Sequence, residues 1–391
     1  MKTKLTGLLV LIVLMAGFVV QSSAAVVLEQ KAGDSDYTLK LFGFSQLDMR
    51  GGDGNSEEGG MFFQAQRIRI GASYFHQNWF SFLLVDFNQP SEVREAGLPK
   101  IIKDAFVGYR FSDAAFIRMG MMKTPSGMTF TTHSWDLDIA ERNHLDKGLV
   151  LERDFGIMLS GRQIGGSHDD PHPMNGTEVG HEQHGGYGFG YDIGVFNTAE
   201  RCLAVERDPA QKGDALAYAG RLHYDMGLPL HFEASYGLSE HAGGADNPLA
   251  DEDYKVFDTG FNSFLMDEVF NLKCEYVYGQ DIQGVDGWEQ SCFSAMAGYM
   301  VTPTIEGVVK VYAASAKRDD VETDLTNTYV GLNFFINPLG LGNPHLLQSH
   351  RIQLNYVFVG GDKAGSAVEF NGLEEGVHMD DCWIMQWQYK F

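Results

Sequence analysis

The chain has 391 residues, with 46 glycines, 11 prolines and a formal net charge of -23. So acidic a chain is not expected to bind nucleic acid or anionic lipid through overall electrostatic attraction. Its four cysteines form no C-x-x-C pair, which argues against a c-type haem protein or a zinc ribbon.

The first 25 residues have the pattern of a secretory signal peptide. A short basic stretch precedes an apolar run from 8 to 20, and small residues follow up to Ala25. The apolar run is shorter than the ~20 residues that span a bilayer as a helix, which disfavours a membrane anchor. We therefore expect cleavage after Ala24 or Ala25 and a mature domain of residues 26–391.

Beyond this segment, apolar and polar residues alternate with a period of two through most of the chain. In 187–196 every second residue is aromatic or aliphatic, and Gly or Asp fills most positions between them. Alternation suits strands with one lipid-facing and one lumen-facing surface, although strands of a soluble β-sandwich alternate too. Sixteen strands are predicted, at 37–49, 62–75, 79–88, 101–111, 115–121, 155–163, 187–196, 216–225, 230–239, 254–264, 269–280, 289–301, 304–316, 325–336, 349–360 and 382–391.

The connections favour a membrane barrel over a sandwich. Short turns at 76–78, 112–114, 226–229 and 302–303 interleave with longer loops rich in glycine and acidic residues. An even number of strands, short periplasmic turns and long external loops characterise bacterial outer-membrane barrels. The longer loops include 50–61, 89–100, 197–215, 240–253, 317–324 and 361–381. Because every strand is needed to close a barrel, we expect a single all-β domain, a transmembrane antiparallel barrel.

The C-terminal strand carries an assembly signal. Phe391 is the last residue, and Trp387 and Tyr389 share its face of the strand. This pattern resembles the terminal-strand signal that the bacterial barrel-insertion machinery reads. It predicts insertion into the outer membrane of a Gram-negative bacterium, in contact with lipid and lipopolysaccharide.

Six segments between residue 37 and about residue 200 resemble the phosphate-selective porin O and P family. They are 66–71, 103–110, 118–125, 141–142, 153–161 and 194–197. The resemblance implies a 16-stranded barrel that forms a homotrimer. It also implies that the third external loop, here roughly 122–154, folds inward and narrows the pore.

In that family, basic side chains line the constriction and attract anions. The matching positions here are Arg67, Arg69, Arg118, Lys123, Arg142 and Arg153. The chain departs from the family at Gln66, where members often carry another arginine, and in its acidic loops. For these reasons phosphate specificity is not carried over, and an anion preference is the expectation.

The alternation of residues between the two faces of a strand, here called strand parity, supports three of these positions independently. Ile68 and Ile70 suit lipid, so Arg67 and Arg69 should face the lumen, because arginine facing lipid at mid-membrane costs about 2–4 kcal/mol. The alternative is that these arginines only pair with barrel carboxylates.

The same parity applies to the strand at 115–121. Ile117, Met119 and Met121 should face outward and Arg118 inward. Asp86 and Asp104 are the expected carboxylate partners if the arginines are structural.

Two further groups of residues are candidates for a metal or partner site and for disulfide bonds. The connection 168–184 is rich in histidine and either binds a metal or a partner, or is a solvated insertion; no metal site is assigned to it. Cys274 and Cys292 have opposite parity and should not be bridged, whereas a disulfide between Cys202 and Cys382 is left open.

The expected function is that of a porin through which ions and small solutes diffuse passively, with an anion or phosphate preference. The alternative is a porin-like sheath around a multihaem cytochrome, which would need a wider bore than an inward-folded loop allows. No nucleophile, metalloprotease or nucleotide-binding motif occurs, so neither an enzyme nor a cofactor is expected.

Overall fold

The computed structural model describes most of the predicted strands and a few of their connections. The described residues are 26–32, 35–52, 60–88, 101–165, 187–197, 215–226, 230–240, 252–266, 269–336, 350–362, 370 and 378–390. The expected signal peptide, Phe391, Cys202 and the histidine-rich stretch 168–184 lie outside them.

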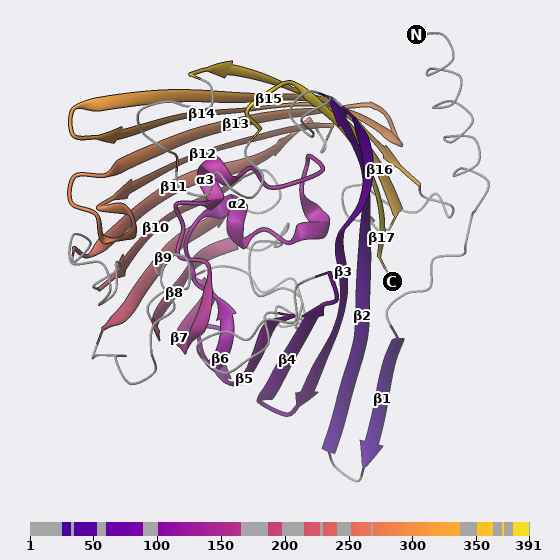
Figure 1. The fold of residues 1–391 in the computed structure, drawn as a ribbon. Helices are drawn as coiled ribbons and strands as arrows, with labels where there is room; N and C mark the ends of the chain where they lie inside the picture. Colours follow the sequence, from indigo (N-terminus) through magenta and orange to yellow (C-terminus); the bar gives the residue numbers. More distant parts are fainter. Residues whose placement is uncertain are drawn as a thin grey trace.

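Sixteen antiparallel strands, β2 to β17, close into a barrel (Figure 1). Each strand pairs with the next, and β17 pairs back with β2, so the predicted 16-stranded barrel is confirmed. The strands are β2 (Ser35–Gly52), β3 (Met61–His76), β4 (Trp79–Asp86), β5 (Ile102–Ser112), β6 (Ala115–Lys123), β7 (Arg153–Ile164), β8 (Tyr187–Asn197), β9 (Leu216–Met226), β10 (His231–Ser239), β11 (Tyr254–Leu265), β12 (Phe270–Gln280), β13 (Glu289–Thr302), β14 (Ile305–Arg318), β15 (Val321–Phe335), β16 (His350–Gly361) and β17 (Cys382–Lys390).

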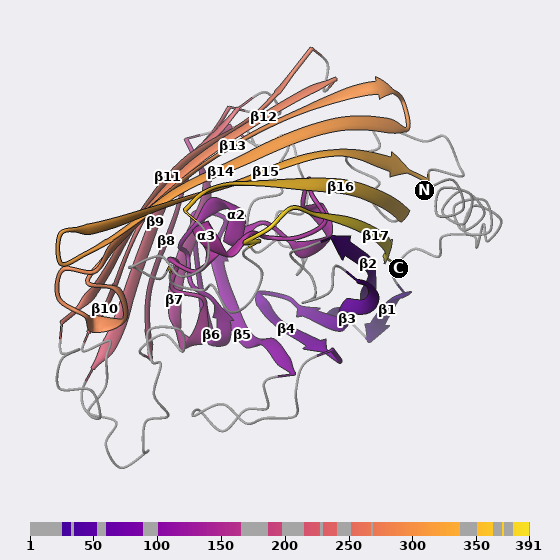
Figure 2. The same ribbon diagram turned by 45° about the horizontal axis from the view of Figure 1, so that its top comes forward.

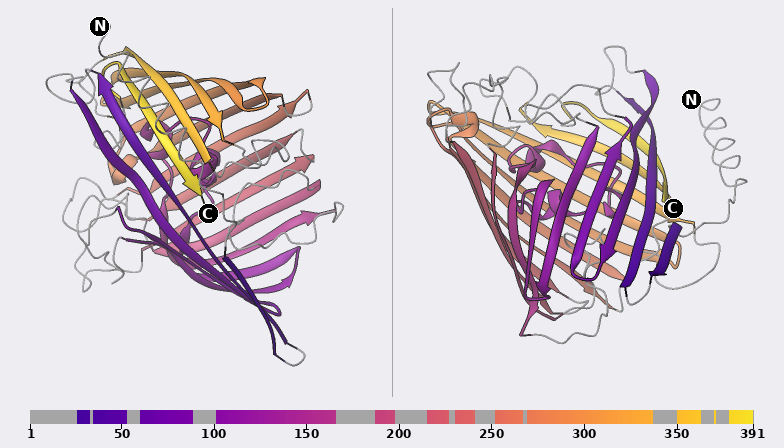
Figure 3. Two further views of the ribbon diagram at one scale, coloured as in Figure 1. Left: turned by 90° about the vertical axis from the view of Figure 1, so that its right-hand side faces the viewer. Right: turned by 90° about the horizontal axis from the view of Figure 1, so that it is seen from below.

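An additional strand, β1 (Val26–Ala32), was not predicted from the sequence. It forms a hairpin with the first part of β2, where Val26 pairs with Leu41 and Ala32 with Ser35. The second part of β2, from Phe44 to Gly52, pairs with β17 along the same edge. β1 and β17 therefore pair with successive parts of the same edge of β2 (Figure 3). We call the junction of β2 and β17, where the first and last strands of the barrel meet, the seam.

The two faces of the strands differ in polarity as the parity argument predicts. On β3, Ile68 and Ile70 are 38% and 48% exposed, whereas Arg69 between them is 8% exposed. An outward belt of exposed apolar side chains suits the hydrocarbon core of a bilayer. Its members also include Leu83, Val107, Met119, Phe189, Leu222, Tyr236, Phe257, Phe293, Val309, Val330 and Phe358.

The exposure of most of β6 agrees with the predicted parity. Ile117 and Met119 are exposed as expected, and Arg118 is buried. Met121 was expected to face outward and is buried as well, although the pairing of β6 with β5 and β7 continues through Gly120 without a register shift.

One predicted loop is a tight turn. Residues 317–324 were expected to form a longer external connection, but β14 ends at Arg318 and β15 begins at Val321. Asp319 and Asp320 have φ values of 51° and 64°, which fits a two-residue hairpin turn that aspartate tolerates. The acidic residues at this position therefore form a two-residue turn and not the predicted longer loop.

Cys274 and Cys292 are free, as strand parity predicts. Cys274 pairs with Ala295 and is partly buried, whereas Cys292 pairs with Val277 and is fully buried. Cys382 is also free in the described part of the chain. In that same part, no helix is long and apolar enough to cross a membrane.

Candidate functional site

The connection between β6 and β7 lies inside the ring of strands (Figure 2). It contains α2 (Met128–Thr131), the 3-10 turn η2 (Ser134–Asp136) and α3 (His144–Lys147). Most of its side chains are buried. We call residues 124–152 the interior segment.

Hydrogen bonds tie the interior segment to opposite walls of the barrel. On one side, Arg69 of β3 donates to the Ser134 hydroxyl over 3.1 Å. On another, the Thr129 amide donates to the Glu275 carboxylate of β12 over 3.0 Å. The Ala140 amide donates to Asn355 of β16 over 2.9 Å. The interior segment therefore crosses the lumen and is held from several directions.

Ionic contacts at Glu141 fix the middle of the interior segment. Its carboxylate lies 2.6 Å from the Arg50 guanidinium of β2 and also bonds His378, which precedes β17. Burial lowers the pKa of His378, but the Glu141 carboxylate and Cys382 raise it to about 10. The imidazole is therefore cationic at neutral pH and pairs with Glu141 as an ion.

Four of the six predicted basic residues contact one part of the interior segment, residues 129–134, and a fifth, Arg67, lies near Arg142. Lys123 donates to the carbonyls of Phe130, Thr131 and Thr132 over 2.8, 2.9 and 3.1 Å, which satisfies the C-terminal end of α2. Arg142 donates to the Thr129 carbonyl over 3.0 Å.

The other members of this group come from β3 and β7. Arg69 and Arg142 both donate to the Ser134 hydroxyl, and Arg153 lies over the Phe130 ring. Burial, followed by the nearby Arg67, Arg153 and Arg69, lowers the pKa of Arg142 well below its usual value. We call Arg67, Arg69, Lys123, Arg142 and Arg153 the basic cluster.

Only part of the basic cluster is neutralised by carboxylates. Arg69 pairs with Asp86 over 2.7 Å and Arg153 with Asp104 over 3.1 Å, the two partners expected if these arginines are structural. Arg67 instead donates to the Gln46 amide oxygen over 2.7 Å. Within the described residues, Arg67, Lys123 and Arg142 form no ion pair with a carboxylate.

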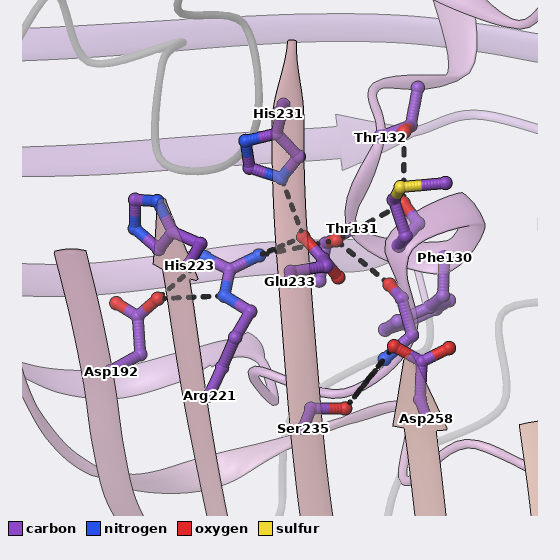
Figure 4. A network of polar contacts seen from close by, with 12 residues as sticks. Phe130, Thr131, Thr132, Asp192, Arg221, His223, His231, Glu233, Ser235 and Asp258 are labelled. Carbon is purple, nitrogen blue, oxygen red and sulfur yellow. Dashed lines mark hydrogen bonds and ion pairs between the residues drawn. The ribbon is translucent and has the colours of Figure 1, made fainter. Parts of the chain in front are cut away.

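Arg118 belongs to a separate group around Asp192 of β8. This carboxylate is fully buried and lies 3.3 Å from Arg118, 2.9 Å from Arg162 and 2.5 Å from Arg221. Ser160 also donates to it over 2.5 Å. Figure 4 shows the Asp192–Arg221 contact and the reach of Arg221 toward Glu233 of β10.

Carboxylates gather on the opposite side of the interior segment. Glu275 of β12 caps the start of α2, and Asp146 of α3 and Asp258 of β11 lie near it. Burial and the Glu275 carboxylate raise the pKa of Asp146 to about 7. The interior segment thus lies between the basic cluster and a group of buried carboxylates.

A cavity of about 50 Å³ lies between the interior segment and the wall formed by β3 to β7. This volume exceeds the roughly 10–15 Å³ that a cavity needs to hold one water molecule. Its charged lining residues are Arg69, Asp104, Arg118, Lys123 and Arg153. The cavity therefore joins the basic cluster to Arg118 and presents an excess of positive charge.

Sequence reasoning missed several charged residues of the lumen. Asp192 and Arg221 lie on strands whose boundaries were predicted, and strand parity alone would have placed both inside. The Glu275 contact was not predictable in this way, because it depends on how the interior segment folds. The same is true of the carbonyls that Lys123 binds.

Comparison with known proteins supports this architecture. The sequence model of the family described as phosphate-selective porin O and P matches residues 41–247. A search of curated proteins finds no match.

Solved structures share the fold at low sequence identity. OmpF of Salmonella typhi, in complex with daunomycin, has a TM-score of 0.61 and 12% identity, covering 93% of this chain and 100% of that chain. The trimer form of OmpT, an outer membrane protein of Vibrio cholerae, has a TM-score of 0.57 and 10% identity, covering 91% and 99%. The anion-selective porin from Comamonas acidovorans has a TM-score of 0.55 and 13% identity, covering 91% and 100%.

Proposed function

Because the chain belongs to the phosphate-selective porin O and P family, we propose that it is an outer-membrane porin for passive diffusion of ions and small solutes. The observation that carries this proposal is the interior segment. Its hydrogen bonds to β3, β12 and β16 hold it across the lumen of a barrel whose outer face is apolar. In this position it narrows the path and brings charged side chains close to a passing solute.

The same arrangement supports a preference for anions over cations. Arg67, Lys123 and Arg142 form no direct ion pair with a described carboxylate, so their positive charge is compensated less than that of Arg69 and Arg153. A charge acts more strongly in a narrow path with low-dielectric walls than in bulk water. Acidic groups on outer loops are screened beyond about 8–10 Å at ordinary ionic strength, so they oppose this effect only weakly.

Replacing Arg67 by Gln tests the anion preference. Loss of one charge about 8 Å from an ion path changes its interaction with each passing ion by about 0.5 kcal/mol even in water-like surroundings. The changes have opposite signs for anions and cations, so together they lower the anion-to-cation permeability ratio roughly fivefold. The variant should therefore shift the reversal potential of single channels in a salt gradient toward cations. The shift should be largest at low salt.

Arg318→Gln is the matched control for this measurement. Arg318 lies at the end of β14 beside a two-residue turn, and its side chain is 48% exposed. The Arg318→Gln variant should leave the reversal potential unchanged. If Arg67→Gln also leaves it unchanged at low salt, the anion preference is wrong although the porin proposal stands.

The alternative function, a sheath around a multihaem cytochrome, fits the interior less well. A sheath would have to accommodate a folded protein within the bore. Here the interior segment crosses that space and is bonded to strands on several sides. This arrangement favours a porin.

The proposed setting is the outer membrane of a Gram-negative bacterium, reached with the signal peptide expected at residues 1–25. We expect contacts with lipid and lipopolysaccharide at the apolar belt, and a homotrimer, as in the trimer form of OmpT. The function needs no catalytic group or cofactor, because a diffusion channel performs no chemical step. Nucleic acid is not an expected partner.

Deleting Phe391 should impair assembly of the barrel. Trp387 and Tyr389 lie on the less buried face of β17, whereas Gln386 and Gln388 on the other face are fully buried. This places the two aromatic residues of the proposed insertion signal on the outward surface. Deletion should sharply reduce the heat-modifiable folded form in outer-membrane fractions. Undiminished folded protein would contradict the assignment of the signal.

A further inference from the structure

Two histidines and an aspartate meet on the lumen face of β9 and β10, at the end where these strands are connected. The Asp225 carboxylate lies 3.1 Å from His223 Nδ1 through one oxygen and 2.6 Å from His231 Nδ1 through the other. One potential metal-binding atom from each residue lies within 4.8 Å of the others. Ligands about 2.0–2.1 Å from a tetrahedral zinc ion are separated by about 3.3 Å, so small movements would bring these atoms to coordination distance.

His231 is oriented as a metal-binding histidine would be. Its Nε2 lies 3.1 Å from the Glu233 carboxylate, and Figure 4 shows His231 and Glu233 linked on β10. A histidine that binds a metal through one ring nitrogen commonly donates a proton from the other to a carboxylate. Without a metal, both ring nitrogens of His231 lie within hydrogen-bond distance of carboxylates, Nδ1 of Asp225 and Nε2 of Glu233. A metal ion would replace the Nδ1 proton, while Glu233 keeps the proton on Nε2 and holds Nδ1 on the side of Asp225 and His223.

The wall of the barrel is shaped around His223. His223 is 7% exposed, and its Nε2 has no hydrogen-bond partner among the described residues. Gly190 of β8 faces the ring, where a Cβ would lie only 2.1 Å from Nε2. A glycine is thus required for the ring to lie flat against β8, which directs Nδ1 toward Asp225.

The charges around the group are compatible with a bound cation. Asp225 and Glu233 supply two carboxylates next to the histidines. Two arginines are close enough to act on His223, Arg162 and Arg221, and both are paired with Asp192, over 2.9 and 2.5 Å. Arg221 also lies 3.7 Å from Glu233. His231 is more exposed than His223 and Asp225, which leaves one side of the group open toward the lumen.

We propose that His223, Asp225 and His231 bind one divalent transition-metal ion on the lumen wall, with Glu233 as the residue that positions His231. Imidazole nitrogens with one carboxylate are a donor set that zinc favours, and a water molecule or chloride would complete the coordination. Mg²⁺ and Ca²⁺ favour sites made of oxygen ligands and should bind much more weakly. The bound ion would add positive charge beside the solute path and so make conductance sensitive to zinc.

Any test must distinguish metal binding at this site from metal binding by the histidine-rich sequence 168–184. It precedes β8, whose first residue Tyr187 pairs with Met226, so it joins the barrel at the same end as His223 and His231. The starting protein should therefore carry His168, His172, His181 and His184 all replaced by Gln. It should also be purified without a polyhistidine tag.

The experiment is titration of this full-length folded barrel in detergent with ZnCl₂, followed by calorimetry, and with CoCl₂, followed by visible absorption. We expect one Zn²⁺ per chain and Co²⁺ bands typical of a site with nitrogen and oxygen ligands, which excess Zn²⁺ removes. His231→Gln should abolish both signals. Glu233→Gln, which removes no ligand, should weaken zinc binding about tenfold to a hundredfold.

Heat modifiability identifies which variants are folded before titration. Should His231→Gln fail to fold, His223→Gln replaces it as the ligand variant. Absence of stoichiometric Zn²⁺ binding by the starting protein would overturn the proposal. Unchanged affinity in a folded ligand variant would also overturn it, since the ion would then be bound elsewhere.

Discussion

Replacing Asp192 by Asn is expected to destabilise the folded barrel by about 3–5 kcal/mol, the usual cost of breaking a buried ion pair by removing one partner. Asp192 is fully buried and accepts hydrogen bonds from Arg118, Arg162 and Arg221. Without its charge, three guanidinium groups would face one another, with Glu233 and Asp225 near Arg221 as partial compensation. The neutral amide would also oppose at least one arginine with its own N–H group.

The effect is measured as the temperature or denaturant concentration at which the purified barrel loses its heat-modifiable mobility. Asp319→Asn is the matched control, because it makes the same exchange at a side chain that is 87% exposed in a turn. Its unfolding transition should coincide with that of the parent. A similarly unchanged transition in Asp192→Asn would show that the three arginines do not depend on this carboxylate.

Removing the interior segment is expected to raise single-channel conductance several-fold. Lys123 and Arg153 are directly paired in the β6–β7 ladder, so a short glycine-rich turn can replace residues 124–152 without separating the strands. The lumen would then no longer be crossed by the interior segment, so its open cross-section would be larger. Water would solvate the lumen side chains that the segment now contacts. Insertion should persist, because every strand of the barrel remains.

Replacing residues 53–59 between β2 and β3 by the same turn provides the control for loop deletion. That variant should keep the parent conductance in planar bilayers. An unaltered conductance after removal of 124–152 would mean that the interior segment does not limit the flow of ions, and the proposed constriction would be wrong.

The barrel was predictable because its signals are local and repeated. The alternation in 187–196 predicts which residues of β8 face outward and which face the lumen. In the same way, Ile68 and Ile70 predict that Arg69 between them faces the lumen. The wrongly predicted loop at 317–324 has a local conformational cause, because Asp319 and Asp320 adopt left-handed backbone angles in a two-residue turn.

The site was less predictable because its partners are distant in sequence. Parity predicts that Arg118 faces inward, but it does not predict that Arg162 and Arg221 share its carboxylate. Likewise, the basic character of Arg142 was visible, but its bonds to the Thr129 carbonyl and Ser134 depend on the fold of the interior segment. Contacts that depend on tertiary folding have no periodic signature along the chain.

The seam between β2 and β17 has a consequence for the order of folding. Gln46 and Gln388 bond across it over 2.7 Å although they are 342 positions apart, so this contact has one of the largest loop-closure costs in the chain. The interior segment bonds to β16 and β17 as well, through Asn355 and Gln388. These bonds can form only when β16, β17 and the interior segment have all reached their final places. Closure of the barrel and fixation of the interior segment then become a single late, cooperative step of assembly.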